Sequence, residues 1–347
     1  MKQDISKPII LGNYYHGDGE MGWAWWLYEH GNLAIVGDND RSPRRKVVTG
    51  ITELLSRRDQ DCVYTISTES PQIGEQSTIN SIPWVEEFPD PPEFLEDRQK
   101  FIDSRHFFST SYFNLYAKTK DIPRSQLLPP IRFKPHVEGP LVGYKRAIES
   151  LSEEDPNKEG LLAALTNLVQ VPWVHVQDQG RKIYIDTEKS VYDQALAFLT
   201  AAWSFWSYSC QTETPQQMLL VVEVPKELLR QGIDPMVEKI VYQTMQILKY
   251  VSIVTTTSII LSSEMLYPAP ELNFRYMLLL QTHDSDLDFT DESIKSSFDP
   301  ALIEEWDKGN SNVGIWMDEA PGDIQDSRIT LRVGDKEPLI WEDYEMS

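Results

Sequence analysis

The sequence predicts an α/β fold in which a mostly parallel β-sheet carries helices on both faces. The stretch Gly31–Lys46 reads as a buried strand, a glycine, a short polar turn and the beginning of a helix. A second strand is predicted after that helix, at Cys62–Ser67, and parallel neighbouring strands require such a crossover connection. Farther along, Met218–Val222 is a short continuous apolar run bounded by turn residues, which is typical of a central parallel strand.

The strand–glycine–loop–helix order of the first stretch is the layout of a phosphate-binding loop. The strand is predicted at Asn32–Val36, Gly37 follows it, and the helix is predicted from about Arg45 to Leu55. A working loop needs a second glycine, a lysine and then a serine or threonine. Backbone N–H groups and the ammonium then hold phosphates, while the hydroxyl holds magnesium.

The residues that perform this chemistry are missing from the loop. Counted from Gly37, the three positions hold Ser42, Pro43 and Arg44. Pro43 offers neither a side-chain cation nor a backbone N–H. We therefore expect the scaffold of a nucleotide-binding site whose catalytic parts have been lost.

The remaining elements are predicted from hydrophobic spacing and turn residues. Residues 8–30 read as two short strands around the turn Gly17-Asp18-Gly19. Later strands are predicted at Trp173–Val176 and Lys182–Ile185 as a hairpin, and at Ser252–Thr256, Tyr276–Gln281, Val313–Met317 and Ile329–Val333. Helices are predicted at Val191–Tyr208, Pro235–Tyr250 and near Pro300–Trp306. Asp186 and Thr187 can cap the first of these helices, which is apolar nearly all round and should be buried.

These patterns divide the chain into four parts. Residues 1–84 form the N-terminal part of the core, 85–170 a proline-rich and partly helical insertion, 171–334 the C-terminal part of the core, and 335–347 an acidic tail. The tail is either a docking motif or an unordered end. The insertion holds basic residues that could meet a nucleic acid or an acidic partner, although a solvated surface is the simpler interpretation. These residues are Lys118, Lys120, Arg124, Arg132 and Lys134.

Composition excludes some classes of function. The 347 residues carry a formal net charge of -22, and binding to phosphate backbones depends on lysine and arginine, so nucleic-acid binding by the chain alone is disfavoured. Cys62 and Cys210 give no disulfide framework, and no Cys/His spacing suits a metal. We find no signal peptide and no apolar segment of transmembrane length, so a cytoplasmic protein is the expectation.

Four short segments, taken in order, match the motifs of one protein family. His30–Gly37 is similar to an entry into a phosphate loop, and Met218–Pro225 stands where the family has an apolar strand ending in Asp-Glu. Lys249–Thr257 looks like the next strand, which usually ends in Ala-Thr-Gln, and Asn273–Arg275 matches an Asn-x-Arg before the following strand. In this order the segments resemble the HerA/FtsK superfamily of P-loop motor ATPases, which includes type IV coupling proteins and type VII secretion ATPases. The resemblance implies a RecA-like P-loop NTPase-type core carrying an inserted, partly helical region.

Several of the matching positions depart from the family. The family's loop lysine contacts phosphates, but here Pro43 or, with a shift, Lys46 stands near that place. The family's strand-end aspartate supports magnesium, a role that Glu223 would fill less well. In the family, the glutamate that follows this aspartate polarises water, which Val224 at the matching position cannot do. Thr257 stands where the family has its sensor glutamine.

The resemblance nevertheless implies a set of nucleotide-binding residues. Arg275 matches the arginine of the family's Asn-x-Arg motif and is either an inter-subunit arginine or a structural ion-pair partner. The implied set is Gly37, Arg44, Arg45, Lys46, Glu223 and Arg275. We predict no catalytic and no metal-binding residue and assign no cofactor, leaving open that ATP and magnesium are bound without turnover.

The leading hypothesis is a pseudo-ATPase that acts as a non-catalytic structural or regulatory subunit of a multi-subunit DNA-processing or secretion complex. Its expected partners are proteins in an oligomeric or heteromeric assembly, an active ATPase among them. One alternative is a divergent but active ATP-dependent DNA translocase that uses Arg44, Arg45 or Lys46 on phosphates and Glu223 on magnesium. A second alternative is an acidic protein-interaction module or inhibitor.

Overall fold

The computed structural model describes only part of the chain, and the structural statements below refer to that part. The described residues are 9–14, 20–23, 32–37, 44–58, 63–68, 149–156, 158–159, 162, 174–177, 182–211, 218–230, 232–254, 257–264, 272, 274–280, 313–318, 328–332 and 339–340. Most of the predicted insertion, its basic residues and the helix predicted near Pro300–Trp306 lie outside them.

The chain divides into two compact units. The first, called the sheet unit here, comprises Met1–Thr65, Gln217–Lys226 and Thr256–Ser347. The second, called the helix unit, comprises Ile66–Gln216 and Glu227–Thr255. Each unit is therefore assembled from segments that lie far apart in the sequence.

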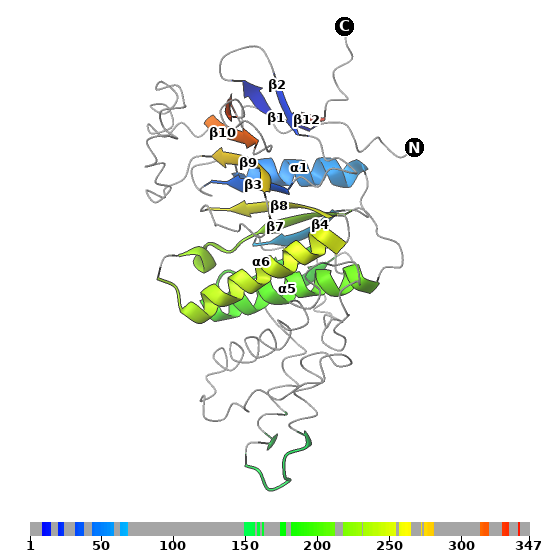
Figure 1. The fold of residues 1–347 in the computed structure, drawn as a ribbon, viewed down its shortest axis with the longest axis vertical. Helices are drawn as coiled ribbons and strands as arrows, with labels where there is room; N and C mark the ends of the chain where they lie inside the picture. Colours follow the sequence, from blue (N-terminus) through cyan, green and yellow to red (C-terminus); the bar gives the residue numbers. More distant parts are fainter. Residues whose placement is uncertain are drawn as a thin grey trace. The chain divides into compact units, whose positions relative to one another are not determined.

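Four parallel strands form the centre of the sheet unit (Figure 1). They are β3 (Asn32–Val36), β7 (Met218–Glu223), β8 (Thr257–Ser263) and β9 (Phe274–Leu280). β8 lies between β7 and β3, and β3 lies between β8 and β9. The register pairs Val36 and Glu223 with the last two residues of β8, so β3, β7 and β8 end at the same edge of the sheet.

The strands beyond β9 pair antiparallel, so the predicted parallel arrangement is seen among the four central strands and does not extend to this half of the sheet. Its strands are β10 (Val313–Asp318), β11 (Arg328–Arg332), β1 (Ile9–Tyr14), β2 (Glu20–Trp23) and β12 (Leu339–Ile340). They continue from β9 in the order β10, β11, β1, β12, with β2 also paired to β1. At the other end of the four central strands, β4 (Val63–Ser67) is the next strand of the sheet after β7. The two predicted N-terminal strands and the two predicted C-terminal strands are confirmed, while β12 was not predicted.

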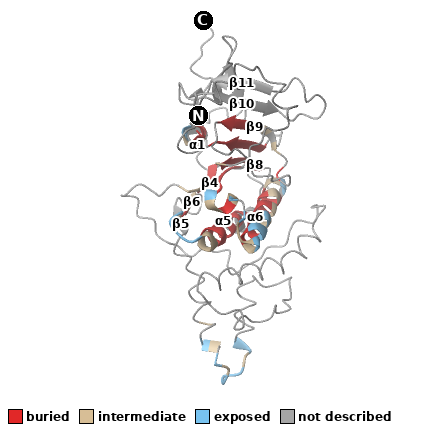
Figure 2. Cartoon of the chain, turned by 90° about the vertical axis from the view of Figure 1, so that its left-hand side faces the viewer, coloured by how far each residue is buried: buried red, intermediate tan, exposed pale blue. Residues whose placement is uncertain are grey.

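Burial explains why the central strands read as continuous apolar runs. Every residue of β3 and of β8 is buried, as a strand covered on both faces must be (Figure 2). At the beginning of β3, Asn32 accepts a hydrogen bond from the backbone N–H of Ile259 at 3.0 Å and donates one to the backbone carbonyl of Leu272. This buried amide fixes β3 against its neighbour.

Helix α1 (Arg44–Arg58) packs against β3. Its buried residues Val47 and Ile51 lie four positions apart and so share one face of the helix. The predicted helix is confirmed, beginning at Arg44 and ending three residues later than expected. The arrangement of helices on both faces of the sheet stays a prediction, because the other long helices belong to the helix unit.

The helix unit is built around two long helices, α5 (Val191–Gln211) and α6 (Pro235–Val254). The ring of Trp206 meets that of Tyr250 edge to face, with centroids 6.1 Å apart. Consecutive residues from Gln194 to Ala202 are all buried, which confirms the prediction that this apolar helix is internal. The hairpin of β5 (Val174–Gln177) and β6 (Lys182–Ile185) is confirmed as well.

The strand predicted at Ser252–Thr256 is wrong. α6 runs on to Val254, and the strand is β8, which begins at Thr257. Buried Leu248 and Val251 continue the three-to-four-residue spacing of Thr244, so packing along one helix face outweighs the β-preference of these branched residues.

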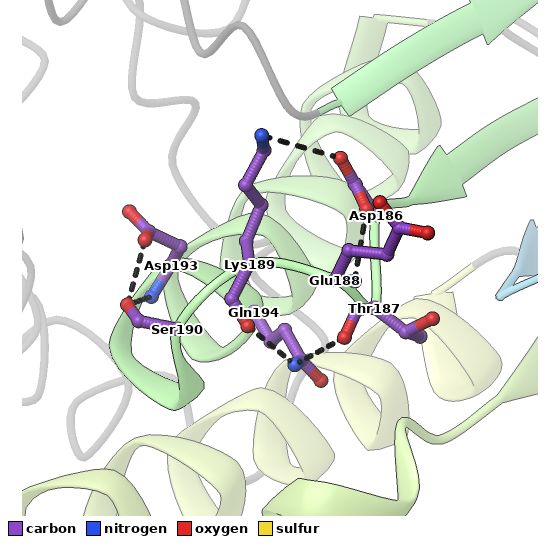
Figure 3. Close-up of polar contacts among 7 residues, drawn as sticks. All are labelled: Asp186, Thr187, Glu188, Lys189, Ser190, Asp193 and Gln194. Atoms are coloured by element: carbon purple, nitrogen blue, oxygen red, sulfur yellow. Dashed lines mark hydrogen bonds and ion pairs between the residues drawn. The ribbon is translucent and has the colours of Figure 1, made fainter.

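The first turn of α5 is capped differently from the prediction (Figure 3). Ser190 accepts a hydrogen bond from the backbone N–H of Asp193 at 3.2 Å, and its hydroxyl donates to the Asp193 carboxylate at 2.6 Å. Asp186 instead forms a turn by accepting from the N–H of Glu188 at 2.9 Å. The cap is therefore Ser190 and not Asp186 or Thr187, because a side chain must directly precede the helix to reach its free N–H groups.

The first turn of α6 is tied to α5 through one carboxylate. Asp234 accepts from the backbone N–H of Met236 at 2.8 Å and from the Tyr192 hydroxyl at 2.8 Å. Gly232 has a φ of 73°, a conformation that favours glycine, and it lets the chain turn just before this cap. None of the helices in the described residues has the length and apolar character that crossing a bilayer requires.

We predict that Tyr192→Phe lowers the free energy of unfolding by about 1 kcal/mol, because it removes a part-buried hydrogen bond of about that strength. Urea denaturation followed by circular dichroism measures the change. Tyr242→Phe is the matched control: Tyr242 is 46% exposed and its hydroxyl accepts a local bond from Gln246. The control should change stability by less than about 0.5 kcal/mol. Equal losses in the two variants would show that the contact with Asp234 does not tie the helices.

Candidate functional site

The carboxyl ends of β3, β7 and β8 meet at one edge of the sheet unit. The backbone N–H of Gly37, directly after β3, donates to the carbonyl of Ser263 at 3.0 Å. The N–H of Val224, directly after β7, donates to the carbonyl of Ser262 at 2.9 Å. Ligands of parallel α/β sheets bind outside this edge, so polar side chains here are the first candidates for a functional site.

Arg44, the first residue of α1, is buried at this edge. Its Nη1 donates a hydrogen bond to the hydroxyl of Ser262, and its Nη2 donates to Glu223 Oε1 at 3.3 Å. The Arg44 side chain is 1% exposed and that of Glu223 is 9% exposed. The guanidinium thus joins α1 to the ends of β7 and β8 with both of its terminal nitrogens.

A second arginine contacts the same carboxylate. Arg45 Nε lies 3.4 Å from Glu223 Oε1, and the Arg45 side chain is 41% exposed. Lys46 follows and is exposed. The first turn of α1 therefore holds three cations and no acidic residue, although the helix dipole favours negative charge there. Glu223 supplies part of the compensating negative charge.

Burial lowers the pKa of the Arg44 guanidinium below its ordinary value, and this desolvation outweighs the opposing effect of Glu223 and Glu264. The positive charge of Arg45 acts in the same direction as burial. Arginine still stays charged at neutral pH. A buried ion pair of this kind is weak evidence for stability on its own, because the cost of desolvation opposes the attraction between its charges.

The structure brings some of the predicted residues together. Arg44, Arg45 and Glu223 form one cluster, and Gly37 lies at the same edge through its bond to Ser263. Lys46 is on α1 beside them in sequence. Arg275 lies within β9, one residue after its beginning, and its side chain is outside the described part.

Three polar residues of the edge were missed, because the strand that leads to them was predicted too early in the chain. Thr257 begins β8 and does not end it, so it cannot stand at a strand-end sensor position. The residues at that end are Ser262, Ser263 and Glu264. The apolar run Ile259–Leu261 carries the same signal that identified β7 and would have located them.

Magnesium does not fit this arrangement. It requires a near-octahedral set of oxygen ligands, and the Glu223 carboxylate and Ser262 hydroxyl instead hold a guanidinium. Within the described ranges, no group of three His, Cys, Asp or Glu side chains could hold a metal ion.

Comparison with known proteins gives no family assignment. No protein-family model matches the chain, and no curated protein matches it. Among solved structures, the chain is similar to the cytoplasmic domain of the type VII secretion ATPase EccC from Thermomonospora curvata, with 9% identity and a TM-score of 0.38, over 96% of this chain and 29% of that one. It is also similar to the pCW3 conjugation coupling protein TcpA with ATPγS, with 9% identity and a TM-score of 0.36, over 96% and 67%.

A third similar structure contains ATPases 2 and 3 of EssC from Geobacillus thermodenitrificans, with 10% identity and a TM-score of 0.35, over 97% of this chain and 46% of that one. The chain thus spans about three tenths of the EccC chain and under half of the EssC chain. Similarity at this level assigns neither a fold nor a function.

We predict that the buried ion pair is strongly coupled. Arg44→Met or Glu223→Leu alone should lower the free energy of unfolding by about 3–5 kcal/mol, because each leaves a buried charge without its main partner. The double variant should be less destabilised than either single variant, since no buried charge of the pair remains. Denaturant unfolding of the four proteins measures this coupling.

Arg45→Met is the matched control, because it removes a half-exposed arginine from the same carboxylate. Its effect should stay below about 1 kcal/mol, as is usual for exposed ion pairs. Additive losses for Arg44→Met and Glu223→Leu would contradict the contact.

Proposed function

We propose that the chain is a pseudo-ATPase of the HerA/FtsK type, a non-catalytic structural or regulatory subunit of a multi-subunit DNA-processing or secretion complex. The observation that supports the proposal most strongly is that the Glu223 carboxylate is paired with arginines. This acidic residue ends the central strand β7, where a P-loop enzyme needs a carboxylate for its magnesium, and two arginines hold it instead.

Hydrolysis of a nucleotide requires a metal ion on the phosphates, a cation close to them and a group that orients water. Glu223 is engaged by Arg44 and Arg45 and is nearly inaccessible. The next residue, Val224, is buried and has no proton acceptor. Pro43 stands at the position of the loop lysine. At these positions the chain therefore lacks an available metal ligand, a loop lysine and a group that orients water.

The scaffold is kept although the chemistry is absent. The central strands are buried and parallel, and the edge at which a phosphate would lie is still bordered by Gly37 and by the beginning of α1. Arg45 and Lys46 are accessible cations at that helix end, which favours an anion. In this proposal a nucleotide at this edge is not turned over, and the functional partners are other proteins of the assembly.

The alternative of an active, divergent translocase draws its support from the accessible Arg45 and Lys46. It requires Glu223 to hold magnesium, which the contact with Arg44 opposes. The net charge of -22 also disfavours tracking along DNA without a partner. The non-catalytic subunit is therefore the better supported of the two.

We predict that the purified chain releases no phosphate from ATP above the level of a heat-denatured sample, whereas ordinary enzymes turn over at about 10 s⁻¹. Phosphate release and calorimetric titration of ATP in the same preparation test this. If ATP binds, Lys46→Ala should weaken it, whereas the control Lys239→Ala on an exposed position of α6 should not. Steady phosphate release that Lys46→Ala abolishes would contradict the proposal and favour the translocase.

A further inference from the structure

We infer that Arg44 is a built-in cation: its guanidinium occupies the position between the ends of β7 and β8 that a divalent metal ion would take in a phosphate-binding site. The inference rests on the proposed function only in taking this edge of the sheet to be a former phosphate site. The position of the guanidinium is given by its contacts with Glu223 and Ser262.

Two of the oxygen atoms that contact Arg44, on Glu223 and on Ser262, are of types that also bind metal cations. Glu223 ends β7 and lies directly opposite Ser262 of β8 in the parallel register. A carboxylate from one strand and a hydroxyl beside it are ligand types that hard divalent cations prefer. Both oxygens face one guanidinium, whose Nη1 and Nη2 each donate to one of them.

The place of Arg44 in the sequence explains how the exchange is possible. Counted from Gly37, it stands where a working loop has the serine or threonine that holds magnesium. That position is the first residue of α1, and its side chain reaches the ends of both strands. The residue that would hold the ion has thus been replaced by one that carries the positive charge itself.

The arrangement also excludes an added metal ion. Arg44 and Glu223 are nearly inaccessible, so an ion could enter only by displacing the guanidinium. Arg45, 3.4 Å from the same oxygen, adds a second positive charge that repels a divalent cation. Any anion at this edge is therefore balanced by fixed side chains, and its binding should not depend on magnesium.

An ordinary structural ion pair would differ from a built-in cation in one respect. If Arg44 replaces a metal ion, shortening it to serine recreates a carboxylate and two hydroxyls that can bind one. If the pair is only structural, the shortened variant is destabilised and divalent cations do not restore it.

The experiment compares thermal unfolding of wild type, Arg44→Ser and the matched control Arg45→Ser, with MgCl₂ or with NaCl of equal ionic strength. We expect saturating MgCl₂ to raise the Tm of Arg44→Ser by about 2–4 °C relative to NaCl. Wild type and Arg45→Ser should show no such difference. The double variant Arg44→Ser/Glu223→Gln should lose the response. No response in Arg44→Ser, or an equal one in wild type, would overturn the inference.

A second measurement uses wild type alone, in case Arg44→Ser does not fold with or without magnesium. Fe²⁺ with ascorbate and peroxide cleaves the backbone beside bound metal ions, and mass spectrometry locates the cuts. We expect no cleavage next to Glu223 or Ser262 in wild type. Cleavage there would show that a metal reaches these oxygens and would overturn the inference.

Phosphate release, measured on the same samples, separates this inference from the proposed function. Release by wild type together with magnesium rescue of Arg44→Ser would refute the non-catalytic role and leave the built-in cation standing. Absence of both would refute the built-in cation and leave the non-catalytic role standing.

Discussion

The contact of Arg44 with Glu223 and Ser262 is the constraint on which the candidate site depends. A charge that is 1% exposed is tolerable only when its desolvation is offset by a partner and by hydrogen bonds. Here one guanidinium meets a carboxylate at the end of β7 and a hydroxyl at the end of β8. The first residue of α1 is thereby fixed against two neighbouring parallel strands, while Val47 and Ile51 supply the buried apolar face of the same helix.

This pairing is the main support for the proposed non-catalytic role of the sheet edge. A phosphate-binding enzyme needs a cation that arrives with its nucleotide and bridges the phosphates. A guanidinium anchored on the chain cannot arrive or leave, and it withdraws Glu223 from any other role. The lowered pKa of Arg44, caused chiefly by burial, indicates that the charge is kept there at a cost in free energy. Replacing a buried ion pair by a hydrophobic pair of similar volume is often neutral or stabilising, so the polarity of this edge calls for an explanation besides stability.

Sequence periodicity located the elements more readily than the chemistry. β3, β7 and α5 could be predicted because buried strands and helices read as uninterrupted apolar runs, and the hairpin of β5 and β6 because its residues alternate around a turn. The strand at Ser252–Thr256 was misplaced because β-branched residues at the end of α6 are held helical by packing, which a local preference cannot reveal. Spacing from Gly37 placed Arg44 where a working phosphate loop has a hydroxyl, but could not show that its side chain turns inward to Glu223, since that depends on strands about two hundred residues away.

The most direct test of the account is a crystal structure of the whole chain soaked with Mn²⁺, whose anomalous scattering marks any bound ion. We expect a guanidinium in contact with Glu223 and Ser262 and no anomalous peak beside them. A peak between the two oxygens, with Arg44 turned away, would contradict the built-in cation and would restore the case for a metal-dependent nucleotide site.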